Sequence, residues 1–177
     1  MPHSKMDTAR GEFENCTFTQ CDFSNGIFTA SVFIDCIFTA CNLTMVKLTD
    51  CLLNGAAFKD CKVLGVNFSD CTDLPFSVKF DGCIMDYCSF AKKKMKKTVF
   101  ANSSMKGVDL SECDLTRSVF TNTDLMSAVF NRTILKEADF LTAQNFIIDP
   151  EINSVKKAKF SLHGAVGLLN KYDLNIE

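Results

Sequence analysis

The sequence lacks the residues and segments on which most enzymes depend. It has no tryptophan, three prolines and only two histidines, His3 and His163, in 177 residues. Two isolated histidines give little basis for a histidine-centred active site or a zinc site, and no glycine-rich phosphate loop or nucleophile elbow is present. We therefore expect a non-enzymatic protein without a cofactor or a bound metal.

Long apolar segments are absent as well. No apolar run approaches the eighteen or so residues that a membrane-spanning helix needs. The first ten residues, MPHSKMDTAR, have no apolar core like that of a signal peptide. We expect residues 1–10 to be a flexible lead-in, and the protein to be cytoplasmic with no membrane partner.

The sequence contains instead an internal repeat of five residues. Each of twelve blocks between Gly11 and Asp70 has a large apolar residue at its centre and a small or short residue two positions earlier. After an irregular stretch, thirteen further blocks are centred on residues from Phe80 to Phe140. All twenty-five centres are apolar, and the remaining positions are mostly polar. Repeats of this kind determine the architecture and are read before local propensity.

A period of five fits neither a helix nor a flat strand. On an α-helix each step of five rotates the apolar centre by roughly 140°, so no single face would be buried. In a strand, successive centres would point to opposite sides, because five is odd. The pattern is satisfied if the chain turns a corner in every block, always toward the same side. Such coils stack into a solenoid whose interior holds the centres and the small residues.

Ten cysteines raise the alternatives of a metal site, redox chemistry or simple packing. Nine of the ten occupy the small position two residues before a centre, where other blocks have Ala, Ser, Gly or Val, and Cys71 has the same place in the block where the repeat is interrupted. Free cysteine fills such a position well as a small buried hydrophobe. We expect free thiols with few accessible sulfur atoms.

The repeat is interrupted at residues 72–79, TDLPFSVK. The centres Phe68 and Phe80 are twelve residues apart instead of ten, so two residues are inserted around Pro75. Proline cannot donate to a strand ladder and suits a bulged corner. This irregular corner is either a tolerated insertion or a functional loop.

A basic belt follows at residues 91–97, AKKKMKK. Lys93 falls in the inward small position, where an unpaired ammonium would be costly, so we expect a distortion that lets it reach water. The outward lysines either contact an anion or nucleic acid, or form a solvated corner beside Asp114. We favour the solvated corner and expect no direct nucleic-acid partner. The lysines remain the candidate partner surface: Lys92, Lys94, Lys96 and Lys97.

Apolar residues also occur at outward positions, among them Ile37, Val129 and Ile134. If four blocks make one coil, Val32 would lie beside Leu52. Apolar neighbours on a sheet face can form a partner surface, but β-branched residues also simply favour strands. We favour the second interpretation.

Several blocks resemble a known family. CDFSN, VNFSD, VDLSE, CDLTR and ADFLT are similar to the A(D/N)LXX signature of the pentapeptide-repeat proteins, over about Gly11 to Thr142. The resemblance implies an all-β fold, a right-handed quadrilateral β-helix with four blocks per coil. On that basis residues 11–145 would form about six coils, with the irregular corner at 72–79.

The tail resembles one branch of that family. IDPEINSV is similar to the segment after the repeats in microcin B immunity proteins, and GLLNKYDLNIE to the ending of quinolone-resistance (Qnr) proteins. The resemblance implies that residues 146–177 form a C-terminal helical cap and a strand that join two rods into a homodimer. A monomeric cap is the alternative. The candidate dimer residues are Leu162, Val166, Leu169, Tyr172, Leu174 and Ile176.

The same branch implies a function. Its members are expected to protect DNA gyrase or topoisomerase IV from quinolone or microcin-type poisons with an acidic rod that mimics DNA. Here the net charge is only −2, and residues 76–107 carry seven basic and two acidic side chains between two modestly acidic zones. About six coils at one strand spacing each make a rod roughly 30 Å long. A duplex of that length would carry about eighteen negative charges. The alternative function is a generic protein-interaction rod with an unknown partner and no role in drug resistance.

Overall fold

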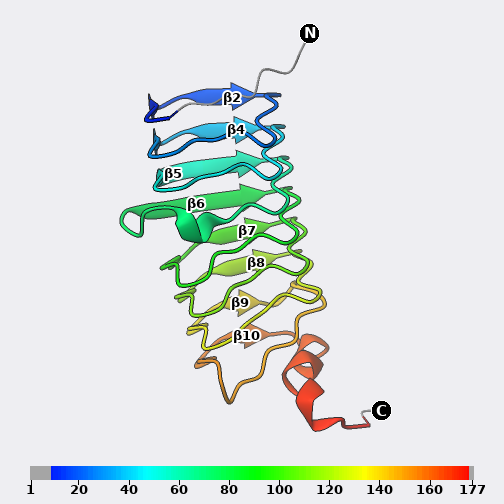
Figure 1. Cartoon of the computed structure of the whole chain (residues 1–177). Coiled ribbons are helices and arrows are strands. Elements are labelled where there is room, and N and C mark those ends of the chain that lie inside the picture. The colour runs from blue at the N-terminus through cyan, green and yellow to red at the C-terminus, as the bar shows by residue number, and fades with distance from the viewer. Residues whose placement is uncertain (1–8, 176–177) are drawn as a thin grey trace.

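The protein is a parallel β-solenoid of about seven turns with almost no helix (Figure 1). A computed structural model describes residues 9–175. The expected all-β β-helix is confirmed. It has about seven turns, where the repeat region alone indicates about six, because the coil continues beyond residue 145.

The strands are short and pair only in parallel. Residue 12 lies opposite residue 32, which lies opposite residue 52, so one coil takes four blocks of five. The same register places Val99 beside Val119. The strands are β1 (Glu12–Glu14), β2 (Thr17–Thr19), β3 (Val32–Ile34), β4 (Ile37–Thr39), β5 (Leu52–Lys59), β6 (Phe76–Asp81), β7 (Val99–Ala101), β8 (Val119–Thr121), β9 (Asp139–Phe140) and β10 (Lys159–Phe160).

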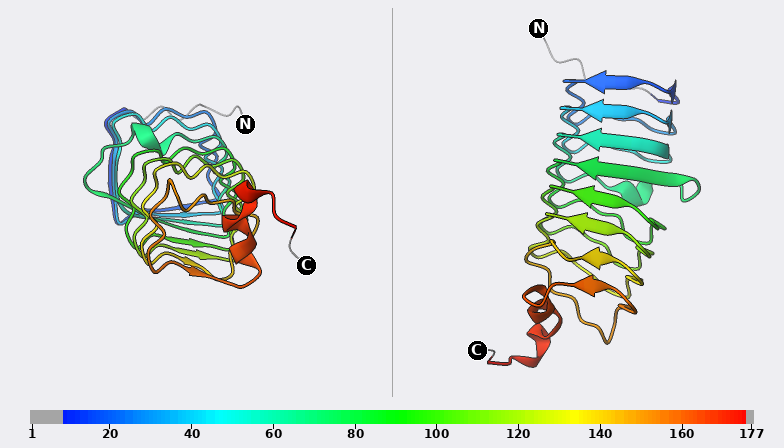
Figure 2. Two further views of the ribbon diagram at one scale, coloured as in Figure 1. Left: turned by 90° about the horizontal axis from the view of Figure 1, so that it is seen from below. Right: turned by 180° about the vertical axis from the view of Figure 1, so that it is seen from behind.

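Each coil has four faces, and each block forms one rung of a face. We call the face that contains β1 and β3 the first face and the face that contains β2 and β4 the second face. β5 and β6 run across both. The second-face strands from β2 to β10 form the column of arrows in Figure 1, and Figure 2 shows the closed coil from below.

The corners explain the period of five. The residue two positions after a centre has a positive φ at most corners, for example 52° at Asn15, 57° at Asn25 and 49° at Asn102. This left-handed conformation turns the chain, and Asn, Asp and Gly adopt it most readily. The corner thus explains the polar and glycine residues at this position of many blocks.

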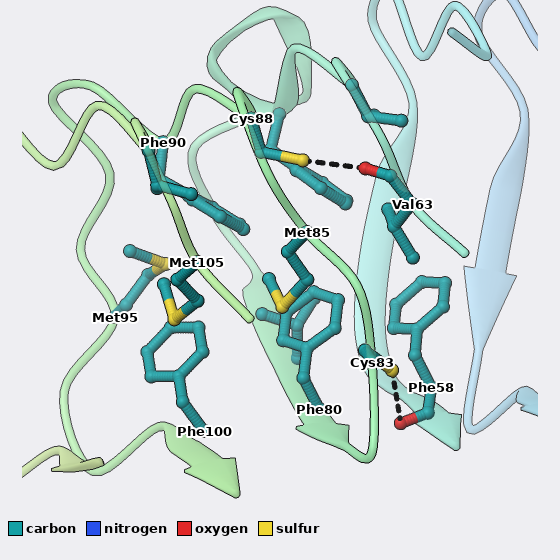
Figure 3. Packing of buried hydrophobic residues seen from close by; sticks show 14 of the residues in the cluster. Phe58, Val63, Phe80, Cys83, Met85, Cys88, Phe90, Met95, Phe100 and Met105 are labelled. Carbon is teal, nitrogen blue, oxygen red and sulfur yellow. Dashed lines mark hydrogen bonds between the residues drawn. The ribbon is translucent and has the colours of Figure 1, made fainter. Parts of the chain in front are cut away.

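The apolar centres fill the interior. Along the second face, phenylalanine rings stack in one column, with centroids 4.9 Å apart between Phe38 and Phe58 and 5.1 Å between Phe100 and Phe120. Figure 3 shows part of this column with methionines packed beside it. Each fully buried ring contributes about 1.5–3 kcal/mol of hydrophobic stabilisation, so the column is a main source of stability.

The two inserted residues lie at the irregular corner between η1 (Phe68–Asp70) and β6. The pairing of β5 with β6 shifts from Leu53 opposite Phe76 to Ala56 opposite Val78, which absorbs the insertion within one coil. Phe76 and Val78 are buried, whereas Leu74 is 75% exposed. The loop projects from the side of the rod in both views (Figures 1 and 2).

The last turn extends past the boundary that the repeats suggested. β10 pairs with β9, and Ile134 bridges Ser154, so residues up to Phe160 belong to the solenoid. The expected helical cap consists of two 3₁₀ segments, η2 (Gly164–Leu168) and η3 (Asn170–Tyr172), which lie at the lower end of the rod (Figure 2). The expected strand through Leu174 does not form over residues 173–175, and Ile176 and most of the lead-in lie outside the described residues. Among residues 9–175 no helix is long and apolar enough to cross a membrane.

Candidate functional site

The cysteine column is structural. All ten cysteines are free, eight are buried and Cys16 and Cys21 are partly buried, which confirms their placement as thiols. Burial raises the pKa of both Cys88 and Cys113 to about 12, so these thiols are protonated and unreactive at neutral pH. No cluster of three or more metal-ligating side chains occurs within the described part of the chain.

The small inward residues also satisfy backbone carbonyl groups of the preceding coil. Cys88 Sγ donates to the carbonyl oxygen of Val63 at 2.8 Å, and Cys83 Sγ to that of Phe58 at 3.4 Å (Figure 3). Ser118 Oγ makes the equivalent bond to the Met95 carbonyl oxygen at 2.8 Å. Cys, Ser and Thr therefore recur here because a short donor can reach a buried acceptor.

Lys93 does not reach water, and the expected distortion is wrong. Its side chain is 1% exposed and stays in the inward position. The ammonium donates to the carbonyl oxygen of Cys71 at 2.5 Å and to Asp73 Oδ1 at 2.8 Å, and lies 5.3 Å from the centroid of the Phe76 ring. These partners compensate the buried charge from within the protein, so solvent is not needed.

The partners of Lys93 come from the irregular corner. One coil earlier, the Cys51 carbonyl oxygen accepts a hydrogen bond from the backbone N–H of Thr72, whereas the Cys71 carbonyl oxygen accepts from the lysine ammonium. The inserted segment and the inward lysine are thus two halves of one feature. The sequence analysis did not identify Asp73 and Phe76 as partners of Lys93. The sequence does contain a signal for them, because Lys93 occupies the inward small position one coil after the insertion.

The four outward lysines of the belt are exposed, as expected, and they lie close together. Lys94, Lys96 and Lys97 share one rung of the first face, and Lys92 occupies the preceding corner. Asp114 lies on the next coil, where it pairs with Lys96 at 3.2 Å. The other three lysines form no ion pair with a described residue.

The C-terminal segment exposes apolar side chains. Leu162 is 94% exposed, and Val166, Leu169, Tyr172 and Leu174 are also exposed. On the inner side, the Ile148 N–H donates to the Gly167 carbonyl oxygen at 3.1 Å, which attaches the cap to the last coil.

Ion pairs also attach the cap to the last coil. Lys171 pairs with Asp149 at 2.8 Å and Glu151 at 2.6 Å, and the Tyr172 hydroxyl donates to Glu151 at 2.8 Å. The bond to Glu151 raises the pKa of Tyr172, because the neighbouring carboxylate disfavours the phenolate. Tyr172 therefore already has a partner within the chain.

A pocket of about 420 Å³ lies between the last coil and the cap. Its lining includes Gln144, Phe146, Ser161 and His163. Ser161 Oγ accepts a hydrogen bond from the Gly164 N–H at 2.9 Å, so its role is to hold the start of η2.

Comparisons with known proteins agree with the repeat pattern. A family model described as a pentapeptide repeat region matches residues 11–73, and a second model, of eight pentapeptide repeats, matches residues 103–140. Together they cover more than half of the chain. Curated protein sequences give no significant match.

Among solved structures, a trypsin-treated variant of QnrB1, described as a plasmid-mediated fluoroquinolone resistance protein, is similar with a TM-score of 0.61 and 16% identity. The match covers 97% of this chain and 100% of that one. Full-length QnrB1 gives a TM-score of 0.51 at 16% identity, covering 92% and 90%. HetL of the cyanobacterium Nostoc gives a TM-score of 0.46 at 13% identity, covering 88% and 87%. At these identities the likeness concerns the fold.

Proposed function

Because the chain is a pentapeptide-repeat protein, we propose that it is a non-enzymatic binding protein that protects DNA gyrase or topoisomerase IV from quinolone or microcin-type poisons. The observation that carries this proposal is the end-to-end likeness to QnrB1, which includes nearly the whole of both chains. The filled interior supports it, because the apolar centres and thiols leave recognition to the outward residues.

The charge distribution limits how such a rod would act. A uniform mimic of duplex DNA is not present, because basic residues interrupt the acidic ones along the rod. We propose that the coils before the irregular corner form the contact. Their exposed corner carboxylates include Asp35, Asp50 and Asp60, all at positive-φ positions.

The decisive experiment is supercoiling by purified gyrase with ciprofloxacin, with and without the protein. We expect the protein to restore supercoiling and to bind a gyrase subunit in a pull-down. The combined variant Asp35→Asn, Asp50→Asn, Asp60→Asn should lose this protection, since asparagine tolerates the corner conformation but carries no charge. The matched control is the combined variant Lys47→Gln, Lys59→Gln, Lys62→Gln. It removes three positive charges from the same coils and should retain protection. If the wild-type protein neither restored supercoiling nor bound a gyrase subunit, the gyrase proposal would be refuted. The generic protein-interaction rod would then be the remaining function.

We also propose a homodimer through the C-terminal segment. Support comes from the exposed apolar side chains of Leu162, Val166 and Leu169, which a second copy would cover. Light scattering at micromolar concentration should give twice the chain mass, and Leu162→Asp with Leu169→Asp should give the monomer. Tyr172→Phe is the control, because its hydroxyl bonds within the chain. A monomeric wild-type protein would refute the dimer without affecting the gyrase proposal.

A further inference from the structure

The basic belt is part of a larger charged surface. On the first face, the backbones of successive coils pair through parallel β-bridges, from Lys94 to Asp114, from Asp114 to Ile134 and from Ile134 to Ser154. Four consecutive rungs therefore lie in register. We define the basic face as the outward residues of ranges 94–97, 114–117, 134–137 and 154–157. These ranges contain seven basic and two acidic residues. The linear sequence hides this surface because its rungs are twenty residues apart.

The two acidic residues of the basic face are already neutralised. Asp114 pairs with Lys96 at 3.2 Å, and Glu137 pairs with Arg117 at 2.7 Å and with Lys136 at 3.8 Å. The Arg117 guanidinium holds the pKa of Glu137 below its ordinary value, so this carboxylate is ionised and paired at neutral pH. The remaining cations are exposed and form no ion pair with a described residue: Lys94, Lys97, Lys156 and Lys157.

The composition of the basic face indicates the kind of partner. Its outward positions include no aromatic residue, and four of its cations are lysines that form no ion pair with a described residue. Protein interfaces are depleted in lysine and depend on Trp, Tyr and Arg. Single-stranded nucleic acids need aromatic platforms for base stacking. Phosphate groups of a duplex need only positive charge within reach, and a flat strand face has no element that would enter a groove.

We propose that the basic face binds the phosphate backbone of double-stranded nucleic acid without reading its sequence. The four rungs span roughly 14 Å at about 4.8 Å per coil. Over that length a duplex carries about eight phosphates, of which about half face one side. Four unpaired lysines match that number. This interaction does not depend on any gyrase contact. It differs from the expectation, drawn from residues 91–97 alone, that the protein has no direct nucleic-acid partner.

The test is binding of a fluorescent 30-base-pair DNA duplex by anisotropy, with the full chain. With about four phosphates neutralised, the logarithm of the affinity should fall with a slope of about −3.6 against the logarithm of salt concentration. This slope predicts an affinity roughly 100-fold weaker at 200 mM than at 50 mM salt. Because the chain as a whole has a charge of −2, such binding would have to come from a local surface.

The test variant neutralises the four free cations by Lys94→Gln, Lys97→Asn, Lys156→Gln and Lys157→Asn. Asparagine is chosen at the corners because φ is 61° at Lys97 and 58° at Lys157. We expect binding at 50 mM salt to weaken more than tenfold and the salt slope to approach zero. The matched control changes four exposed lysines outside the basic face to Gln, namely Lys47, Lys59, Lys62 and Lys79, and should retain binding. Circular dichroism confirms that both variants remain folded.

Three results would overturn the proposal. The first is no duplex binding by the wild-type protein at 50 mM salt. The second is an equal loss in the control variant, which would mean that only net charge matters. The third is tighter binding of polyglutamate than of the duplex, which would identify the basic face as a site for an acidic protein instead.

Discussion

The Lys93 ammonium lies 2.8 Å from a carboxylate oxygen of Asp73, which belongs to the irregular corner of the preceding coil. The lysine is buried, whereas the carboxylate is 81% exposed, so the pair joins the interior of the rod to a projecting loop. Lys93 therefore helps to hold the loop against the rod, and this contribution can be measured.

Lys93→Met should destabilise the protein by about 1–3 kcal/mol, because the buried Cys71 carbonyl oxygen loses its donor. Urea unfolding measures the change, and limited proteolysis should show faster cleavage at residues 72–79. Lys92→Met is the matched control. That lysine is adjacent and exposed, and its replacement should change the unfolding free energy by no more than about 0.5 kcal/mol. Equal stability of the two variants would contradict the structural role of the buried lysine.

The same pair predicts a pH dependence. The hydrogen bond and charge of Lys93 lower the pKa of Asp73 in the folded state. This carboxylate thus stabilises the fold above its ordinary pKa of about 4, and the contribution is lost as the pH falls through the lower, folded-state value. Below about pH 4, the unfolding free energy of the wild-type protein should therefore fall more steeply than that of Asp73→Asn. Parallel curves from acid titrations of both proteins in urea would show that the pair is not formed in solution.

The sequence was sufficient to predict the coil, because every centre and every small residue repeats the same physical constraint. It predicted the placement of Cys88 and Phe120 for that reason. The inward position of Lys93 was predicted in the same way, but its partners were not, because they lie about twenty residues away in the irregular corner. Only the twenty-residue register brings Asp73 and Phe76 to the ammonium.

The ends and outer surface of the rod were harder to predict. The resemblance implied a helical cap within residues 146–177, but the structure has short 3₁₀ segments there instead. Gly164 and Gly167 pack against Phe146 there, and close backbone contact determines the local geometry. The basic face was also missed, because charges twenty residues apart become neighbours only after coiling.

Thiol labelling should distinguish buried from partly buried cysteines. In the native protein we expect rapid reaction at no more than two positions, Cys16 and Cys21, because the other eight are buried. Burial raises the pKa of Cys71 to about 12, so making the solution moderately alkaline should not make it reactive. All ten should react in denaturant. Mass spectrometry of the native adduct gives the count, and three or more rapid additions would contradict the inward column.

Truncation of a ring within the aromatic column should cost far more than truncation at its end. Phe120 is fully buried and stacks between Phe100 and Phe140, at centroid distances of 5.1 and 4.6 Å. Phe120→Ala should destabilise the protein by about 3–5 kcal/mol through lost burial and a residual cavity. Phe18→Ala is the control, because this ring stacks on Phe38 at the first-coil end of the same column and is only partly buried. Denaturant unfolding that gave equal losses would show that the column does not act as a continuous core.

Gly167→Ala should loosen the C-terminal cap while leaving the coils intact. A Cβ atom at this position would clash with the carbonyl oxygen of Phe146, a backbone atom that cannot rotate away. The 3₁₀ segment must therefore shift outward, which would lengthen the hydrogen bond from Ile148 to Gly167. We expect faster proteolysis within residues 161–175 and an unchanged β-sheet signal in circular dichroism. Val166→Ala is the control, because its side chain is exposed on the outer side of the same segment and should leave proteolysis unchanged. If both variants were cleaved at the wild-type rate, the cap would not be attached through this contact.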